Sequence, residues 1–388
     1  MNRRSKIFRI LSLVVFTALI FSFYVFSFAH DQVNEKQILE YLEQIRLKAE
    51  VPGVSAAVGV DGKIVFAGGV GFAELENQVP QTSTTVHNIG SISKTPAVVS
   101  IMQLVEQGKI KLDEPIQKYA TFFPEKRWPI TISNILTHTS GIRHYKTNVY
   151  EEFGPSAIKQ MQYFEKFDEK AIDFFKDDPL LFKPGESWSY SSFATNLLQA
   201  VVEKASGMGY EEYLAKNIWM PAGMLSTAID VPSRIIHKRG RGYIRMKGAL
   251  INFPFVDVSY KYVGGGIIST VEDLVRFGQA LNAGALLKEE TVAKMYTVQI
   301  DPVMRFIKDK DPKKADFKQA LIWRVDEDSK GRTFIEHGGV VRGTTSWLVN
   351  YPDKDVVVAI HTNYHSYMPL KGHAVAIAQL FLPHKKGE

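Results

Sequence analysis

The sequence predicts an α+β protein in which an antiparallel sheet, built from the N- and C-terminal segments, is flanked by helices. Two observations predict this class. Strand-like segments lie near both ends of the 388-residue chain, and a long helix-rich region separates them. The helix-rich region is expected to form a second lobe, with a cleft between the lobe and the sheet.

The body of the chain begins with a predicted helix and a predicted β-hairpin. Apolar residues recur at helical spacing from residue 34 to about residue 49. Residues 54–60 and 63–67 have the composition of strands, and the Asp61-Gly62 pair between them suits a tight two-residue turn. These segments supply the N-terminal part of the sheet.

Helices are expected in the middle of the chain, and strands return near its C terminus. The expected helices cover residues 96–107, 156–176, 196–205 and 271–281. The expected strands cover residues 333–337, 345–349 and 356–362, with a turn at residues 351–355. A helix at residues 371–382 closes the chain, and the charge run at residues 309–318 is expected to be a solvated loop.

The composition is that of an ordinary globular protein, with 45% hydrophobic, 12% aromatic and 23% charged residues. The net charge is +6, but Arg3, Arg4, Lys6 and Arg9 supply four of these charges. The rest of the chain is therefore near neutral, and no nucleic-acid partner is expected. The chain has no cysteine, which excludes disulfides, thiolate metal sites and a cysteine nucleophile.

Residues 10–29 are uncharged and follow a basic start, which predicts an export element. Twenty residues can span a bilayer, so a retained membrane anchor is one alternative. Cleavage as a signal peptide of residues 1–29 is the other, because Ser27-Phe28-Ala29 offers small residues just before His30. A buried core helix would not explain the flanking charges. In both favoured cases the body is exported to the periplasm or the extracellular space.

The segment Gly90-Ser91-Ile92-Ser93-Lys94 predicts a nucleophilic serine. Pro96 is tolerated in the first turn of a helix, which places the helix start near Ile92 or Ser93 and Ser91 at its tip. Residues three apart share a helix face, so the Lys94 ammonium can reach the Ser91 hydroxyl and activate it. A helix N-cap is the alternative role for Ser91.

A second Ser-x-x-Lys match, Ser156/Lys159, follows Gly154-Pro155 among charged residues. This context fits a helix cap followed by a solvated lysine. The pattern alone therefore does not identify a catalytic site.

Residues 88–94 resemble the nucleophile motif of the serine β-lactamase-like family. That family includes class C β-lactamases, D-alanyl-D-alanine carboxypeptidases, related esterases and mitochondrial β-lactamase-like proteases. Further matches follow in the family's order at residues 135–141, 184–192, 264–270 and 337–339. Residues 258–263 look closest to the mitochondrial branch. The resemblance covers about residues 35 to 380 and implies a β-lactamase/penicillin-binding-protein-like fold for residues 34–385.

The resemblance implies a site for acyl transfer. Ser91 would attack a carbonyl carbon, while Lys94 and Tyr190 would move its proton, with either one as the general base. The backbone N–H groups of Ser91 and Val340 would form the oxyanion hole. The remaining positions implied to bind substrate are His337, Gly338, Gly339 and Ser192. No cofactor or metal is implied.

Two departures from the family pattern bear on the substrate. Ser192 stands where the family commonly has the asparagine of Tyr-x-Asn, and His337-Gly338-Gly339 stands where Lys-Thr-Gly is common. The second change removes a permanent cation and a hydroxyl, both of which would help to hold the carboxylate of a β-lactam. A peptidase or esterase acting on a small-molecule or peptide substrate is therefore favoured over a β-lactamase or D-alanyl-D-alanine carboxypeptidase.

Two questions remain open at this stage, namely whether the protein is catalytic and where Arg342 lies. A catalytically silent protein of the same fold could bind peptidoglycan or another ligand. Arg342 could reach the cleft and bind a substrate carboxylate, or it could lie on the surface. His138 is expected to be structural, and a metal site at His361 and His365 is not expected because a strand would not hold them on one face.

The two fates of residues 1–29 give different N termini. Sequencing the N terminus of the exported protein is expected to show a start at His30 if the segment is a cleaved signal. A start upstream of residue 10 would exclude cleavage and favour the anchor.

Overall fold

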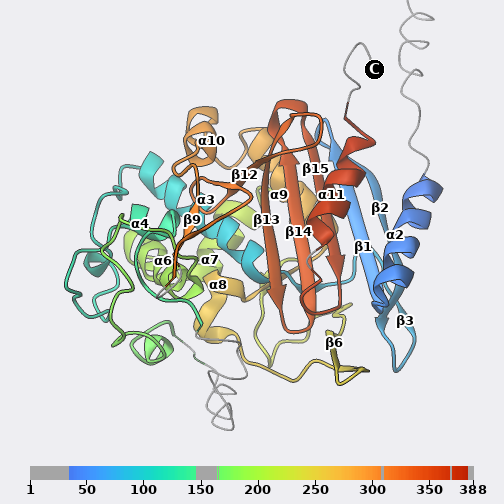
Figure 1. Ribbon diagram of the computed structural model, residues 1–388, viewed down its shortest axis with the longest axis horizontal. Helices are drawn as coiled ribbons and strands as arrows, with labels where there is room; N and C mark the ends of the chain where they lie inside the picture. The colour runs from blue at the N-terminus through green and yellow to red at the C-terminus, as the bar shows by residue number, and fades with distance from the viewer. Residues whose placement is uncertain (1–34, 146–163, 165, 307–309, 368, 383–388) are drawn as a thin grey trace, which may run out of the picture. The chain divides into compact units, whose positions relative to one another are not determined.

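The computed structural model describes residues 35–145, 164, 166–306, 310–367 and 369–382 (Figure 1). The chain divides into two compact units, Met1–Ile38 and Leu39–Glu388, and the second contains the sheet and its helices. The predicted export segment, Ser156 and Lys159 lie outside the described residues. Within the described ranges, no helix has the length and apolar composition that a bilayer crossing requires.

An eight-stranded antiparallel sheet joins the two ends of the unit, in the order β11-β12-β13-β14-β15-β1-β2-β3 (Figure 1). Its strands are β1 (Gly53–Val60), β2 (Lys63–Glu74), β3 (Val79–Pro80), β11 (Lys318–Gln319), β12 (Arg324–Glu327), β13 (Thr333–Val341), β14 (Thr344–Tyr351) and β15 (Val356–Thr362). The N-terminal hairpin pairs with the last strand, and Val58 lies opposite Val358. The predicted α+β class is therefore confirmed.

The turn between β1 and β2 has the predicted geometry. Asp61 and Gly62 both have positive φ values, 48° and 73°. Two such residues in sequence make the type I′ turn that matches the twist of a hairpin. Val60 consequently lies opposite Lys63, and the pairing continues to Gly53 with a bulge after Val58.

Both faces of the sheet are covered, which explains why every residue of β15 is buried. Helix α9 (Val271–Asn282) packs behind β1 and β15, and α11 (Leu370–Gln379) packs in front of β14 and β15 (Figure 1). Residues 39–49 of α2 (Glu35–Ala49) lie beside α11, where the Tyr41 hydroxyl is 2.8 Å from Nδ1 of His373.

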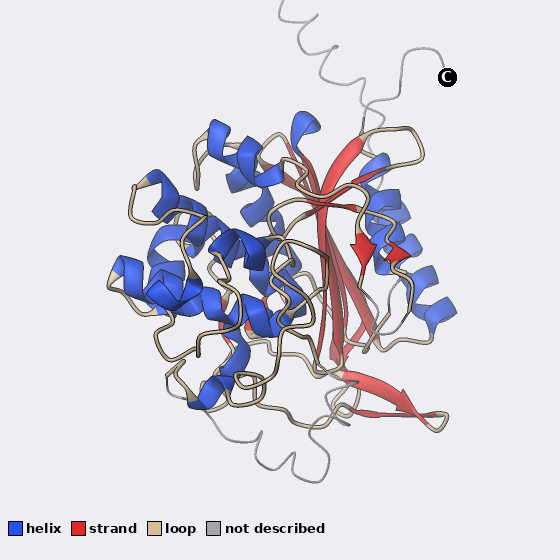
Figure 2. Ribbon diagram, turned by 60° about the vertical axis from the view of Figure 1, so that its left-hand side comes forward, coloured by secondary structure: helices blue, strands red, loops and turns tan. Residues whose placement is uncertain are grey.

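A helical lobe packs on the α9 side of the sheet, which Figure 2 shows nearly edge-on. Its helices are α3 (Lys94–Glu106), α4 (Ile132–Leu136), α6 (Ser192–Ser206), α7 (Tyr210–Leu214), α8 (Tyr262–Gly265) and α10 (Glu289–Tyr296). Helix α3 lies at the centre of the lobe, since residues 94–104 are buried without exception. One hydrophobic core joins this helix to α6, α9 and the sheet.

Short strands complete the fold. They form a three-stranded sheet of β4 (His87–Asn88), β8 (Ile267–Ser269) and β5 (Ala228–Ile229), a hairpin of β6 (Tyr243–Met246) and β7 (Ala249–Asn252), and a pair of β9 (Met304–Arg305) and β10 (Lys313–Lys314). The three-stranded sheet is important for the site because β4 leads directly into the segment that carries Ser91.

Two predictions of local structure were wrong. Over residues 166–176 the expected helix is replaced by turns and one short 3-10 helix, Lys170–Ile172. The Asp168 side chain accepts a hydrogen bond from the Lys170 N–H there, a local bond that competes with helix formation. The segment also buries its aromatic residues individually, as in the stacking of Phe175 on Phe193. The charge run at residues 309–318 contains β10 and the start of β11 rather than a loop alone.

Strand β13 continues four residues beyond the predicted end at His337 and reaches the 3-10 helix η1 (Gly90–Ser93). The two segments touch backbone to backbone. A Cβ atom at Gly339 would lie 1.9 Å from the Ile89 carbonyl oxygen, and one at Gly90 would lie 2.5 Å from the Val340 nitrogen. Gly90 also has φ +54°, in the left-handed region that glycine tolerates best. Glycine at both positions therefore permits this contact.

Gly339→Ala is expected to lower the free energy of unfolding by about 1–3 kcal/mol or more, because the methyl group forces β13 away from η1. Urea unfolding measures the effect. Gly372→Ala is the matched control, since a Cβ atom there meets nothing within 4 Å. Equal unfolding free energies for the two variants would contradict the tight contact.

Candidate active site

Ser91 and Lys94 lie at the junction of η1 and α3. The Lys94 ammonium donates hydrogen bonds to Oγ of Ser91 at 2.9 Å and to the Gly264 carbonyl oxygen at 2.7 Å. The N-cap positions of η1 and α3 are Ile89 and Ser93, and neither helix has a side-chain cap. The alternative role of Ser91 as a helix cap is thus wrong, and its hydroxyl is bound to the lysine.

The site lowers the pKa of Lys94. Burial is the largest cause, since the side chain is fully enclosed and the charged form loses its hydration. The charge of Arg324 lowers the pKa further, while Tyr190 opposes the shift. The neutral amine, which can accept a proton from Ser91, is therefore easier to form than in a solvated lysine.

Tyr190 lies beside this pair, with its ring centroid 5.0 Å from Nζ of Lys94. Burial alone would raise the pKa of its hydroxyl, but Lys94, Ser91 and Arg324 together lower it below the usual value. The ring packs against His138, with centroids 4.5 Å apart. The three predicted catalytic side chains are consequently adjacent, and each of the two candidate bases has a lowered pKa.

The loop that carries Tyr190 is held by the start of α6. The Ser191 hydroxyl accepts from the Ala194 N–H and donates to the Arg143 carbonyl oxygen. His138 has a positive φ of 58°, and its Nδ1 lies 3.4 Å from the Ser191 nitrogen as an acceptor. His138 does not line the cavity, and its contacts are those of a structural residue.

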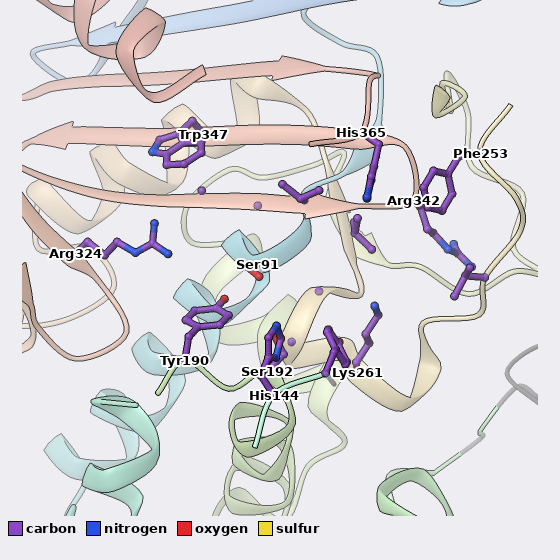
Figure 3. Close-up of a pocket in the computed structure, with 18 residues that line it drawn as sticks. Ser91, His144, Tyr190, Ser192, Phe253, Lys261, Arg324, Arg342, Trp347 and His365 are labelled. Atoms are coloured by element: carbon purple, nitrogen blue, oxygen red, sulfur yellow. Dashed lines mark hydrogen bonds between the residues drawn. The ribbon is translucent and has the colours of Figure 1, made fainter. Parts of the chain in front are cut away.

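A cavity of about 340 Å³ opens over Ser91 (Figure 3). The predicted residues that line it are Ser91, Tyr190, Ser192, Gly338, Gly339 and Val340. The backbone nitrogens of Ser91 and Val340 both lie at the contact between η1 and β13, where a Cβ atom on Gly339 would lie 2.8 Å from the Ser91 nitrogen. Proximity of these two segments is one requirement of the predicted two-donor oxyanion hole.

His337 does not have the predicted contact with the cavity. Its side chain is fully buried, it is not among the lining residues, and its Nδ1 lies 2.7 Å from the Gly338 carbonyl oxygen. Burial, with Arg324 and Lys94 nearby, holds its pKa well below the ordinary value, so the ring is neutral near pH 7. The geometry thus gives no support to a substrate contact at His337, because its strand position directs the side chain away from the cavity.

Arg324 lines the cavity from β12, and sequence reasoning missed it. Its guanidinium lies 3.5 Å from the Glu336 carboxylate, which also accepts a hydrogen bond from Nε1 of Trp347 at 2.8 Å. Arg324 therefore returns a cation to the region where the absence of the family lysine had removed one. Only the pairing of Arg324 with Glu336 across the sheet brings it there, and no sequence motif signals it.

His144 and Lys261 are two further lining residues that the sequence did not indicate. The Ser192 N–H donates to Nδ1 of His144 at 3.2 Å, which places the ring proton on Nε2. Burial, followed by the charges of Lys94 and Lys261, lowers the pKa of His144 to about 3. A neutral imidazole thus stands beside Ser192, near the place of the amide that the family commonly has there (Figure 3).

Arg342, whose position the sequence left open, lines the cavity as well, and an ion pair with the buried Asp230 holds it there. No group of three histidine or acidic side chains within the described ranges is placed to hold a metal ion.

Comparison with known proteins agrees with these features. Residues 35–380 match the Beta-lactamase family model. The human mitochondrial serine beta-lactamase-like protein LACTB is 33% identical, over 81% of this chain and 71% of its own. Esterase EstB of Burkholderia gladioli is 26% identical, over 65% of this chain and 71% of its own.

Solved structures show the same fold. An octameric penicillin-binding protein homologue from Pyrococcus abyssi superposes with a TM-score of 0.73 at 28% identity, covering 88% of this chain and 76% of that one. A class C beta-lactamase superposes with a TM-score of 0.72 at 19% identity, covering 92% and 99% of the two chains. With the family model matched along nearly the whole described body and Ser91 of the nucleophile motif lining the cavity, the chain belongs to the β-lactamase family.

Proposed function

We propose that this protein is a serine hydrolase that cleaves peptide or ester bonds through an acyl-enzyme on Ser91. The observation that carries the proposal is the hydrogen bond from the buried Lys94 to the hydroxyl of Ser91, which lines the cavity. Tyr190 beside them, with its lowered pKa, completes a set of groups that can take and return one proton.

The reaction follows from these positions. As Ser91 Oγ bonds to the carbonyl carbon of the substrate, its proton passes to the neutral Lys94 amine or to the Tyr190 phenolate. The carbonyl oxygen becomes an oxyanion that accepts hydrogen bonds from the N–H groups of Ser91 and Val340. The proton then moves to the leaving amine or alcohol as its bond to carbon breaks. Water, activated by the same base, releases the acyl group and restores Ser91.

Peptides and esters are favoured over β-lactams for two reasons. Ser192 offers only a short side chain that is 3% exposed, and His337 offers no charge and no surface to the cavity. Arg324 supplies a cation, but Glu336 partly neutralises it at 3.5 Å. A β-lactamase or D-alanyl-D-alanine carboxypeptidase uses the same chemistry. The first experiment below distinguishes these two activities from cleavage of peptides or esters. A catalytically silent binding protein is disfavoured, because ligand binding alone does not require lowered pKa values at Lys94 and Tyr190.

The proposal places this hydrolase outside the cytoplasm, in the periplasm or extracellular space. The basic start and the uncharged residues 10–29 support export, and the same residues would hold the protein at the membrane if they are not cleaved.

A fluorophosphonate probe is expected to label Ser91, as located by mass spectrometry of the labelled peptide. Ser91→Ala is expected to abolish labelling and to lower kcat for a p-nitrophenyl ester by about a thousandfold or more. The exposed Ser329→Ala is the control and should behave as wild type. Labelling of Ser91 by penicillin with slow release of the acyl group would favour the carboxypeptidase. Fast turnover of a β-lactam would favour the β-lactamase. Labelling at another residue, or full turnover by Ser91→Ala, would sink the catalytic assignment.

Arg324→Met is expected to shift the rising limb of the pH profile of kcat/KM to higher pH. The Arg324 charge lowers the pKa of both Lys94 and Tyr190. Because the base must be deprotonated to act, removing this charge raises its pKa and activity then appears at higher pH. Arg324→Lys keeps the charge and should keep the limb in place, and the exposed Arg127→Met is the distant control. An unmoved limb in a folded Arg324→Met variant would contradict the electrostatic role of Arg324.

A further inference from the structure

The cavity over Ser91 is unusually one-sided in charge. Its lining includes three cationic side chains, Lys261, Arg324 and Arg342, and no aspartate or glutamate among the described residues. A neutral substrate gains nothing from such a lining, whereas an anion would be attracted to it. The question is which of the three cations is available to bind a substrate group.

Two of the three cations are already paired. Arg324 lies 3.5 Å from Glu336, and Arg342 forms an ion pair with Asp230 while its guanidinium stacks 4.9 Å from the Phe255 ring centroid. Asp230 is fully buried and also forms an ion pair with Arg239 at 3.0 Å. Each of these arginines thus has a carboxylate neighbour that offsets part of its charge, while Nε and Nη2 of Arg342 have no hydrogen-bond partner among the described residues.

Lys261 differs from both arginines. It ends the short 3-10 helix η6 (Ser259–Lys261) and is only 5% exposed. Its backbone N–H donates to the Val258 carbonyl oxygen, but its ammonium has no hydrogen bond or ion pair within the described part of the chain. Its Nζ lies 5.4 Å from the ring centroids of Tyr145 and Tyr260. Aromatic faces contribute far less than a carboxylate to the stability of a buried ammonium.

Asp257, the acidic residue nearest to Lys261 in the sequence, does not form an ion pair with it. Asp257 influences Lys261 electrostatically, but its Oδ1 accepts hydrogen bonds from both the backbone N–H and the hydroxyl of Ser259. Figure 3 shows Lys261 on the opposite side of Ser91 from Arg324 and Trp347. An ammonium without an acidic partner among the described residues thus faces the end of the cavity where a part of the substrate distant from the reacting carbonyl would lie.

We propose that Lys261 binds a carboxylate of the substrate, so that the enzyme selects acyl or leaving groups that carry a negative charge at this end of the cavity. The proposal rests on the proposed function, because it assigns the substrate class of the same site. The bound carboxylate would supply the acceptor that Lys261 lacks, and the charge-assisted hydrogen bond would replace its lost hydration. Arg342 adds positive potential from the same side.

The proposal has a consequence for pH. Burial, then the charges of Arg342 and Lys94, lower the pKa of Lys261 to about 7, with Asp257 acting in the opposite direction. The two cavity histidines add no charge near neutral pH, because burial and Lys261 itself contribute to pKa values of about 3 for His144 and about 4 for His365. Lys261 is thus charged below about pH 7 and loses its charge above it. Selection for an anion should weaken over that interval.

The experiment compares matched substrates. One pair is the mono-p-nitrophenyl ester of adipic acid and its neutral methyl ester, with the charge on the acyl side. The second pair is 3-carboxy-4-nitrophenyl butyrate and p-nitrophenyl butyrate, with the charge on the leaving group. For at least one pair, Lys261→Met is expected to lower the ratio of kcat/KM for the anionic over the neutral substrate by about tenfold or more. The exposed Lys109→Met is the control and should keep the wild-type ratio.

The pH dependence separates a binding role from a structural one. In the wild type the ratio should fall between pH 6 and pH 8, because Lys261 loses its charge over this interval. The effects of Ser91, Lys94 and Tyr190 are common to both substrates and cancel in the ratio. Lys261→Met should show a low, flat ratio, and Lys261→Arg a high, flat ratio, since arginine stays charged throughout. Thermal unfolding of each variant verifies that it is folded.

Equal ratios for wild type and Lys261→Met in both pairs would overturn the proposal while leaving the proposed function intact. Failure of the proposed function has a different signature, namely no Ser91-dependent turnover of the neutral esters. In that event, calorimetric binding of adipic acid monoamide to wild type and Lys261→Met still decides the role of Lys261. Equal affinities there would overturn the proposal, and weaker binding to Lys261→Met would support it.

Discussion

The backbone contact between β13 and η1 is the constraint on which the rest of the site depends. Gly339 and Gly90 let the two segments meet with no side chain between them, so that Ser91 and Val340 come close together where both line the cavity. The contact joins the sheet to the helical lobe at the point where the chemistry is proposed. It also sets the position of Ser91 relative to α3, from which Lys94 reaches the serine hydroxyl.

The electrostatics of the cavity follow from burying cations without an equal number of acids. Lys94 is fully enclosed, and Arg324 adds a second positive charge that lowers the pKa of both Lys94 and Tyr190. The stability lost by burying Lys94 would make its amine a usable base in the proposed reaction. The same surplus of positive charge extends to Lys261 at the other end of the cavity. One physical feature, a cationic cavity of low polarity, thus connects the activation of Ser91 with the proposed selection of an anionic substrate.

Local patterns predicted the elements whose cause is local. The Asp61-Gly62 turn, the helix around Lys94 and the buried strand β15 all have the expected type, because turn chemistry, helix entry and continuous apolar runs act over a few residues. The failures involve tertiary contacts that local patterns do not record. Residues 166–176 carry a helical spacing of apolar residues, yet Phe175 stacks on Phe193 from a series of turns. Strand β13 continues through two glycines of low strand propensity because β14 pairs with them, with Gly338 opposite Trp347.

The sequence by itself determined the class of the fold, the family motifs and the three side chains Ser91, Lys94 and Tyr190, since these depend on spacing along the chain and on residue type. The tertiary structure alone decided which other groups face the cavity. His337 belongs to a motif but its side chain is buried away from the cavity, whereas two residues with no role assigned from the sequence, Arg324 and Lys261, line the cavity. The reason is that side-chain direction and strand pairing join residues that are far apart in the chain, and a sequence pattern carries no record of which strand lies beside which.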